Sequence, residues 1–166
     1  MKLYVNEKLF SIHNKYYVKD ENNNDIFEIS SKVISIGDKT YVKDLNGNVL
    51  AYIEQKIFHL MPNYDIYINN DLKCSISKKF RLFKNDYALS NNYRVEGNFL
   101  SLNFSIYNDQ NIKIGEISRK LISIGDKYTI DIYDEKELIL ILAIIVSIAN
   151  DIDRAQASSN SSSNIN

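Results

Sequence analysis

Hydrophobic and polar residues alternate along most of the chain, in a unit that is repeated about six times. Each unit opens with an apolar run, usually after a lysine, continues as a short alternating strand and ends in an Asn-, Asp- or Gly-rich turn. The clearest copies are 32–48 (KVISIGDKTYVKDLNGN), 120–134 (KLISIGDKYTIDIYD) and 8–25 (KLFSIHNKYYVKDENNND). The units begin 19 to 24 residues apart. This spacing is too short for a βαβ unit and fits a β-hairpin with its connection.

Two columns of the aligned units predict which strand face is buried. The first column holds aromatic residues or threonine, and the second, two residues later, is apolar in every copy. Because side chains alternate across a strand, both columns point to one face, the expected core. The first column is Tyr16, Thr40, Tyr64, Tyr87, Phe104 and Tyr128, and the second is Val18, Val42, Ile66, Leu89, Ile106 and Ile130.

Turn residues after the second column predict that each unit closes as a hairpin. Asn46-Gly47 is the strongest signal, and the asparagines within 69–71, 91–92 and 108–111 tolerate the left-handed backbone that such turns need. If each of the six units is a hairpin, the chain has about twelve strands. The return strands are expected at 26–30, 49–54, 72–77, 93–96 and 112–118.

The alternation stops after Tyr133, where 138–149 (LILILAIIVSIA) is apolar on all sides. The preceding 134–137 (DEKE) resembles a helix N-cap with an acidic residue in the first turn. The run is shorter than the roughly 20 apolar residues of a transmembrane helix, and a short helix that is apolar all round is typically a buried one. We therefore expect a helix over 135–151. A central strand is the alternative, which the length of the run disfavours.

The predicted fold is all-β, a closed barrel of about twelve antiparallel strands wrapped around a buried apolar C-terminal helix. Residues 1–153 are expected to form this single domain, and the Ser/Asn-rich stretch 154–166 is expected to be a disordered tail. A helix in the lumen leaves no large internal ligand cavity. Function is therefore expected on the outer wall or at the ends of the barrel.

The meander that repeats Lys-x-φ-Ser-φ-Gly-Asp-Lys, followed by one apolar helix, resembles the LURP-one-related family. Identical pentapeptides at 35–39 and 123–127 (SIGDK) carry the resemblance, which extends over about residues 1–153. The resemblance implies a tubby-like C-terminal fold, a twelve-stranded barrel around its own C-terminal helix, similar in fold to phospholipid scramblases and tubby proteins. It implies little about activity, because these motifs are structural signatures.

Composition narrows the class of protein further. A chain of 166 residues fits one domain with a sizeable core. The net charge of −1 gives no global field that attracts nucleic acid, so no nucleic-acid partner is expected. The N-terminal segment 1–15 lacks the apolar core of a signal peptide, which predicts a cytoplasmic location. Cys74 is the single cysteine; an internal disulfide is excluded, and Cys74 is expected to be a small core residue.

The lysines that open the units are the candidate binding residues: Lys8, Lys32, Lys56, Lys79 and Lys120. An inward isoleucine three residues before each of the last four places them on the outer face. Such a band could bind anionic phospholipid headgroups or a membrane surface, with each lysine contributing on the order of 1 kcal/mol. The alternative is that the lysines solvate the outer face and protect the sheet from aggregation.

A second functional hypothesis is a protein-interaction or structural scaffold module with no ligand. Tyrosines on the outward faces of the strands motivate it, because aromatic residues are favoured at the centres of interfaces, although they also pair across strands within a sheet. The tyrosines are Tyr17, Tyr41, Tyr52, Tyr67 and Tyr107. The oligomeric state is not predicted.

No catalytic, metal or cofactor site is predicted, and the chain is not expected to be an enzyme. His13 and His59 lack metal-ligand or nucleophile spacing, and a Gly-rich phosphate loop is missing. The Asp/Asn-rich stretches 20–25 and 44–48 fail the EF-hand pattern. Asp131, Asp134 and Glu135 stand where the scramblases, which resemble this chain in fold, carry a calcium-binding segment; helix capping is the favoured explanation. The Gly-Asp-Lys words at 37–39 and 125–127 are expected to serve as turns.

Overall fold

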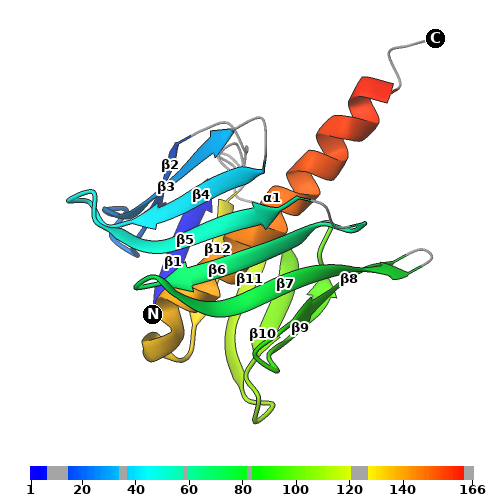
Figure 1. Cartoon of the computed structure of the whole chain (residues 1–166). Helices are drawn as coiled ribbons and strands as arrows, with labels where there is room; N and C mark the ends of the chain where they lie inside the picture. Colours follow the sequence, from blue (N-terminus) through cyan, green and yellow to red (C-terminus); the bar gives the residue numbers. More distant parts are fainter. Residues whose placement is uncertain (7–14, 34–36, 58–59, 82–83, 121–126, 163–166) are drawn as a thin grey trace.

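A computed structural model describes residues 1–6, 15–33, 37–57, 60–81, 84–120 and 127–162 of the chain. Within these residues, twelve antiparallel strands form one sheet that curls into a nearly closed barrel, and one long helix runs through it (Figure 1). This confirms the predicted all-β barrel. The strands are β1 (Lys2–Asn6), β2 (Tyr16–Lys19), β3 (Asp25–Val33), β4 (Asp38–Lys43), β5 (Val49–Lys56), β6 (Asn63–Ile68), β7 (Asp71–Arg81), β8 (Lys84–Leu89), β9 (Arg94–Asn98), β10 (Asn103–Tyr107), β11 (Lys113–Lys120) and β12 (Lys127–Ile132).

The two predicted core columns both face the lumen. All six residues of the first column and all six of the second are buried, with Leu89 the most exposed of them at 9%. The turn prediction is also confirmed, because Asn23, Asn69, Asn92 and Asn111 adopt positive φ angles where hairpins or strand connections reverse. Local alternation and turn chemistry therefore determine which face of each strand packs inward.

Each of four hairpins contains the same one-residue irregularity. The register shifts by one residue at the start of β3, β5, β7 and β11, just after the turn. Such bulges bend a strand and increase its twist, which helps a sheet to curl. Their recurrence at one position of the repeat favours the same bend in each of these four hairpins.

The N-terminal strand completes the last unit of the repeat. The sixth unit supplies β12 and then continues into the helix, so it has no return strand of its own. Strand β1 fills that place, with Lys2 opposite Asp131 and Asn6 opposite Lys127. The N-terminal amine of Met1 also donates a hydrogen bond of 2.9 Å to the carbonyl oxygen of Ile132.

The barrel has a seam between β8 and β9, so the prediction that every unit is a hairpin is wrong for the fourth unit. Among the described residues, β8 pairs with β7 alone and β9 pairs with β10 alone. The chain continues along β7 past the end of β8, where the Ser90 N–H donates to the Ser75 carbonyl oxygen at 3.0 Å. Side chains close the gap from within, since the Tyr87 and Phe99 rings meet edge to face at 5.0 Å.

The lumen is filled by helix α1 (Leu138–Ser162), preceded by the 3-10 turn η2 (Glu135–Glu137). The segment is α-helical, which excludes the strand alternative, and every side chain from 140 to 152 is buried. Small residues at one position of the repeat, Ala51, Cys74 and Gly115, face the lumen. A Cβ atom on Gly115 would lie 2.8 Å from Cγ2 of Ile141, so the helix approaches β11 closely.

The helix is longer than the sequence suggests. The expected disordered tail 154–166 is helical through Ser162 and projects from the barrel (Figure 1). Arg154 pairs with Asp38 and Gln55 at the barrel end, and the Ser158 and Ser159 hydroxyls donate to backbone carbonyls one turn earlier. Because the buried segment has already nucleated the helix, each further residue adds a hydrogen bond without a new nucleation cost.

Candidate functional site

The outer surface and the two ends of the barrel are the places where this fold can bind another molecule. Buried side chains of α1 fill the lumen, and no group of three or more metal-ligating side chains occurs among the described residues. A cleft of about 240 Å³ on the outer wall is lined by 49–52, Tyr67 and 69–70. Its volume is below the roughly 300–1,000 Å³ of typical small-molecule sites.

The unit-opening lysines lie at one end of the barrel, which we call the lysine end. Odd-numbered strands run in one direction, so β3, β5, β7 and β11 all finish there. Lys32 and Lys79 are exposed, as predicted, and Lys56 is about one-third exposed. Lys120 is the last residue of β11, and Lys8 lies outside the described residues. The lysine end is also where α1 leaves the barrel, since Arg154 contacts Asp38 and Gln55 there.

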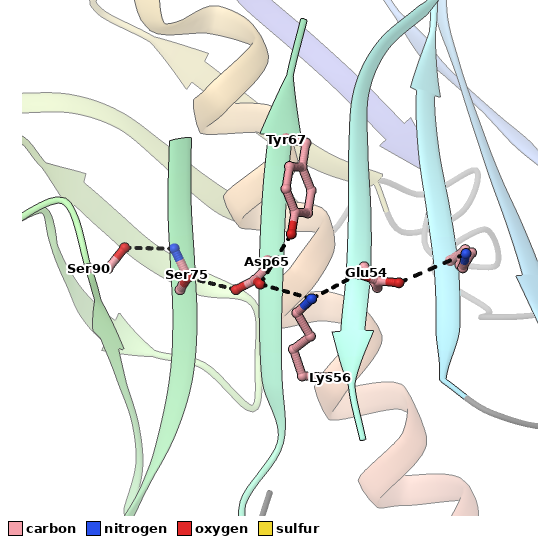
Figure 2. Close-up of polar contacts among 7 residues, drawn as sticks. Glu54, Lys56, Asp65, Tyr67, Ser75 and Ser90 are labelled. Carbon is pink, nitrogen blue, oxygen red and sulfur yellow. Dashed lines mark hydrogen bonds and ion pairs between the residues drawn. The ribbon is translucent and has the colours of Figure 1, made fainter. Parts of the chain in front are cut away.

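Lys56 differs from the other lysines because it is enclosed by carboxylates. Glu54 and Asp65 are directly opposite each other on β5 and β6, where like charges repel. The Lys56 Nζ lies between them, 2.9 Å from Glu54 Oε2 and 3.2 Å from Asp65 Oδ2 (Figure 2). Hydrogen bonds to Glu54 and then Asp65 raise the pKa of Lys56, and the Lys56 bond lowers the pKa of Glu54. Lys56 therefore offsets part of the negative charge of these two carboxylates, and its own charge is fully engaged by them.

Further polar contacts extend this network along the outer wall. The Ser75 hydroxyl donates to Asp65 Oδ1 at 2.6 Å, and the Tyr67 hydroxyl donates to Asp65 Oδ2 at 3.4 Å (Figure 2). The Ser75 N–H donates to the Ser90 hydroxyl oxygen at 2.8 Å. Asp65 is buried despite lying on the outer side of β6, so its contacts hold the wall together.

Three of the predicted outer tyrosines form a row across β4, β5 and β6. Tyr41 is the register partner of Tyr52, and Tyr52 of Tyr67, with ring centroids 5.4 Å and 5.8 Å apart. We call these three residues the tyrosine row. Lysines lie over its rings, Lys43 at 5.7 Å and Lys32 at 6.0 Å from the Tyr41 centroid and Lys39 at 5.6 Å from that of Tyr52. The tyrosine row therefore combines aromatic rings with lysine ammonium groups that lie over two of them.

The other two tyrosines lie apart from the row. Tyr17 on β2 has the Lys15 Nζ 5.3 Å from its ring centroid. Tyr107 on β10 has the Arg94 guanidinium 4.6 Å from its ring centroid. The structure thus brings together only the central three of the five tyrosines that the sequence singled out.

The acidic residues before α1 have structural contacts. Asp134 caps the η2 turn by accepting a hydrogen bond from the Lys136 N–H at 3.0 Å. Asp131 pairs with Lys2 at 3.0 Å, and Glu135 lies 3.7 Å from the N-terminal amine. The capping explanation is confirmed for Asp134. The carboxylates of Asp20 and Asp44 likewise accept hydrogen bonds from the backbone of their own turns.

The Gly-Asp-Lys word at 37–39 combines a turn with a contact to the helix. Gly37 has a φ of +76°, as expected for a turn glycine, and the Asp38 carboxylate pairs with Arg154 of α1. The second copy, at 125–127, begins outside the described residues. His13 and His59 also lie outside them.

A buried polar cluster near the lysine end was missed by the sequence reasoning. Asp151 of α1, 2% exposed, accepts hydrogen bonds from the hydroxyls of Tyr64 at 3.2 Å and Tyr87 at 2.8 Å. The Lys78 Nζ lies 2.7 Å from the same carboxylate. Burial, and then the Asp151 charge, raises the pKa of both tyrosines, so they remain donors. Two signals in the sequence could have indicated this cluster. The buried hydroxyls of Tyr64 and Tyr87 in the first column need hydrogen-bond acceptors, and Asp151 is a polar residue at the end of the apolar run.

Cys74 is a buried core residue, as predicted, and is 1% exposed. Burial raises the pKa of its thiol to about 11, so the thiolate needed for nucleophilic chemistry is disfavoured. Across the described part of the chain, no helix is both long and apolar enough to cross a membrane.

Comparison with known proteins places this arrangement in a family. The uncharacterized protein YxjI of Bacillus subtilis (strain 168) is 27% identical over 147 residues, covering 88% of this chain and 90% of that protein. An X-ray structure of an Arabidopsis thaliana protein matches with a TM-score of 0.58 at 17% identity over 90% of each chain, a likeness of fold alone. The family model described as LURP-one-related matches residues 1–149. Because this match spans nearly the whole barrel, the chain belongs to the LURP-one-related family.

Proposed function

We propose that this protein is a non-catalytic cytoplasmic binding module that recognises an anionic phospholipid surface through the lysine end of its barrel. The observation that carries the proposal is that Lys32 and Lys79 are exposed at the same end, on strands that run in the same direction. Cations on one end of a rigid body can all approach one plane, which lysines scattered around the wall cannot. Each such lysine is worth about 1 kcal/mol near an anionic bilayer.

The filling of the lumen by α1 supports a binding function rather than a catalytic one. Within the described residues, the helix occupies the space that holds a ligand in open barrels of similar strand number. The one thiol is buried and protonated at neutral pH. What remains accessible is a wall of charged and aromatic side chains, which is suited to recognition.

Flotation with vesicles tests the proposal. The protein should float with phosphatidylcholine vesicles that contain phosphatidylserine, and should stay at the bottom of the gradient with phosphatidylcholine alone. Added salt should release it, because screening weakens contacts between exposed charges. Failure to float with the anionic vesicles at low salt contradicts the proposal.

A protein partner that docks on the tyrosine row is the second candidate function. Three adjacent tyrosines with stacked or tilted rings form the largest aromatic group on the described outer wall. The lysines over these rings favour a partner segment that combines apolar and acidic side chains. Replacing Tyr41 and Tyr67 by serine should abolish capture of such a partner while leaving vesicle binding unchanged; equal capture by both proteins contradicts this function.

A further inference from the structure

The tyrosine row continues onto β7 as an apolar strip of the outer wall. Leu72 on β7 is the register partner of Tyr67, and residues directly opposite each other lie on the same face of a sheet. Leu72 is 54% exposed, and Val49 at the start of β5 is 51% exposed. Val49 is in turn the register partner of Lys43 on β4. Exposed aliphatic side chains therefore lie on both strands that flank β6.

The cleft of the outer wall, about 240 Å³ in volume, belongs to the same strip. Val49, Tyr52 and Tyr67 are among the residues that line it, together with Asn69 and Asn70 of the β6–β7 turn. A cavity of about 150 Å³ is already large enough to bind benzene. The cleft therefore fits one large apolar or aromatic side chain better than a whole small molecule.

Three lysines of β3 and β4 lie on one side of this cleft. The ammonium groups of Lys32 and Lys43 are 6.0 Å and 5.7 Å from the ring centroid of Tyr41. The ammonium group of Lys39 is 5.6 Å from the ring centroid of Tyr52. Strands β3 and β4 are both on the same side of β5 in the sheet. A molecule that fills the cleft and extends over Tyr41 therefore meets three positive charges.

The carboxylates next to Lys39 and Lys43 compensate these two lysines only in part. Glu54 is 3.9 Å from Lys39, and Glu28 is 3.5 Å from Lys43. Each of these carboxylates has a second lysine closer to it, at 2.9 Å for Glu54 and 2.7 Å for Glu28. An acidic group supplied by a partner would therefore complement the charge of this side of the cleft.

We propose that the tyrosine row and the cleft together bind a partner peptide in which a bulky apolar side chain fills the cleft and a nearby acidic residue lies against the lysines around Tyr41. This inference rests on the second candidate function and deepens it by assigning the anchor of the partner. The Tyr41 ring is one to two strands from the cleft, roughly 5–10 Å at about 4.8 Å per strand. An extended peptide, at roughly 3.3 Å per residue, covers that distance in about two or three residues.

Selection of random peptides displayed on phage, with the full chain as the target, tests the inference. The enriched peptides should carry a bulky apolar residue with Asp or Glu about two or three positions away. A synthetic peptide of the enriched sequence should bind the Val49→Gln variant about tenfold more weakly, because a longer polar side chain then lies at the cleft. Lys39→Gln/Lys43→Gln should also weaken binding about tenfold and should remove most of its dependence on salt.

Matched controls make the same changes on the β11 side of the barrel. Ile112→Gln replaces another exposed aliphatic residue, and Lys113→Gln/Lys136→Gln removes the same charge. Each control should change the affinity for the peptide by less than about twofold, since neither touches the cleft or the lysines beside it. Thermal unfolding of every variant establishes that it is folded.

The outcomes separate this inference from the function on which it rests. If the enriched peptides need Tyr41 and Tyr67 but bind the Val49→Gln and lysine variants normally, docking on the tyrosine row stands and the assigned anchor is overturned. If they bind Tyr41→Ser/Tyr67→Ser as well as the natural protein, or if no peptide is enriched, both are overturned. Enriched peptides without acidic residues overturn the inference.

Two other occupants of this face would also be recognised. If Val49→Gln abolishes flotation with phosphatidylserine-containing vesicles, the face contacts lipid and the peptide assignment is overturned. If the natural protein is a dimer by size-exclusion chromatography and Val49→Gln makes it a monomer, the occupant is a second copy of the chain, which overturns the assignment as well. Unchanged flotation and an unchanged oligomeric state support it.

Discussion

The ammonium of Lys78 on β7 lies 2.7 Å from the carboxylate of Asp151 on α1, and both side chains are largely removed from water. Two tyrosine hydroxyls complete the shell of Asp151, from β6 and β8. Apolar contacts in the lumen are less directional than hydrogen bonds and ion pairs. These directional contacts, all from one side of the barrel, specify a single rotation and depth for α1.

Replacing Lys78 by methionine should destabilise the fold by about 3–5 kcal/mol, because it leaves the Asp151 charge buried without its cation. Urea denaturation measures the loss. In the double variant Lys78→Met/Asp151→Asn, the amide oxygen still accepts from the tyrosines and no unpaired charge remains. The double variant should therefore be more stable than Lys78→Met alone; simple additivity of the two single changes would contradict the pairing.

Gly115 should tolerate no side chain while Ile141 is present. The Cβ of alanine there would lie 2.8 Å from Ile141 Cγ2, and overpacking of this kind costs about 1–3 kcal/mol. Ile141→Ala removes the clashing atom at the expense of a cavity. Chemical denaturation should show that Ile141→Ala costs less in the Gly115→Ala background than in the natural protein. Equal costs in the two backgrounds would mean that β11 moves away from the helix.

Sequence patterns predicted the parts of this fold that depend on neighbours along the chain. The alternation of apolar and polar residues predicted the buried columns. The turn asparagines predicted where the chain reverses, and the unbroken apolar run predicted the helix in the lumen. Contacts between distant strands could not be predicted in this way. The pairing of β1 with β12 joins the first strand along the chain to the last, and the seam interrupts a unit whose turn residues resemble those of the others.

The site shows the same division between local and distant contacts. The outward positions of Lys32 and Lys79 follow from the isoleucines three residues earlier in their own strands. The neutralisation of Lys56 depends on Asp65 from the next hairpin, and a pattern within one strand contains no information about that register. The pairing of Lys78 with Asp151 depends on the rotation of the helix, which the apolar run leaves unspecified.

Cys74 should resist thiol reagents in the folded state and react at once after unfolding. Burial raises the pKa of its thiol from 9.0 to about 11, and the thiol also donates to Asn91 Oδ1 at 3.5 Å. Because it is the single cysteine, the release of colour from Ellman's reagent reports on this position alone. Rapid reaction at neutral pH without denaturant would show that the core at β7 opens readily.

The same thiol should make stability fall at alkaline pH. The folded pKa is raised, so the stabilising effect is fully present below about pH 9 and is lost as the pH rises towards about 11. The free energy of unfolding of the natural protein should therefore fall, relative to that of Cys74→Ala, by about 2 kcal/mol across this window. A constant difference between the two proteins over the same range would exclude the thiol as the cause.

Arg154 should mark the point beyond which α1 no longer contributes to stability. Its guanidinium pairs with Asp38, whose side chain is 12% exposed, and with Gln55. The described side chains that follow, 155–159, are exposed. A chain that ends after Arg154 should unfold at nearly the same temperature as the full chain. Arg154→Ala should cost about 1–3 kcal/mol, because it leaves a mostly buried carboxylate without its cation.

Gln156→Ala is the matched control for Arg154→Ala, since Gln156 is an exposed position on the same helix. It should leave the unfolding temperature unchanged, because alanine has high helix propensity and the glutamine is solvent-exposed. A large loss of stability on removal of 155–166 would contradict this assignment. The projecting turns would then stabilise the barrel through contacts beyond Arg154, and the end of the structural core would lie further along the helix.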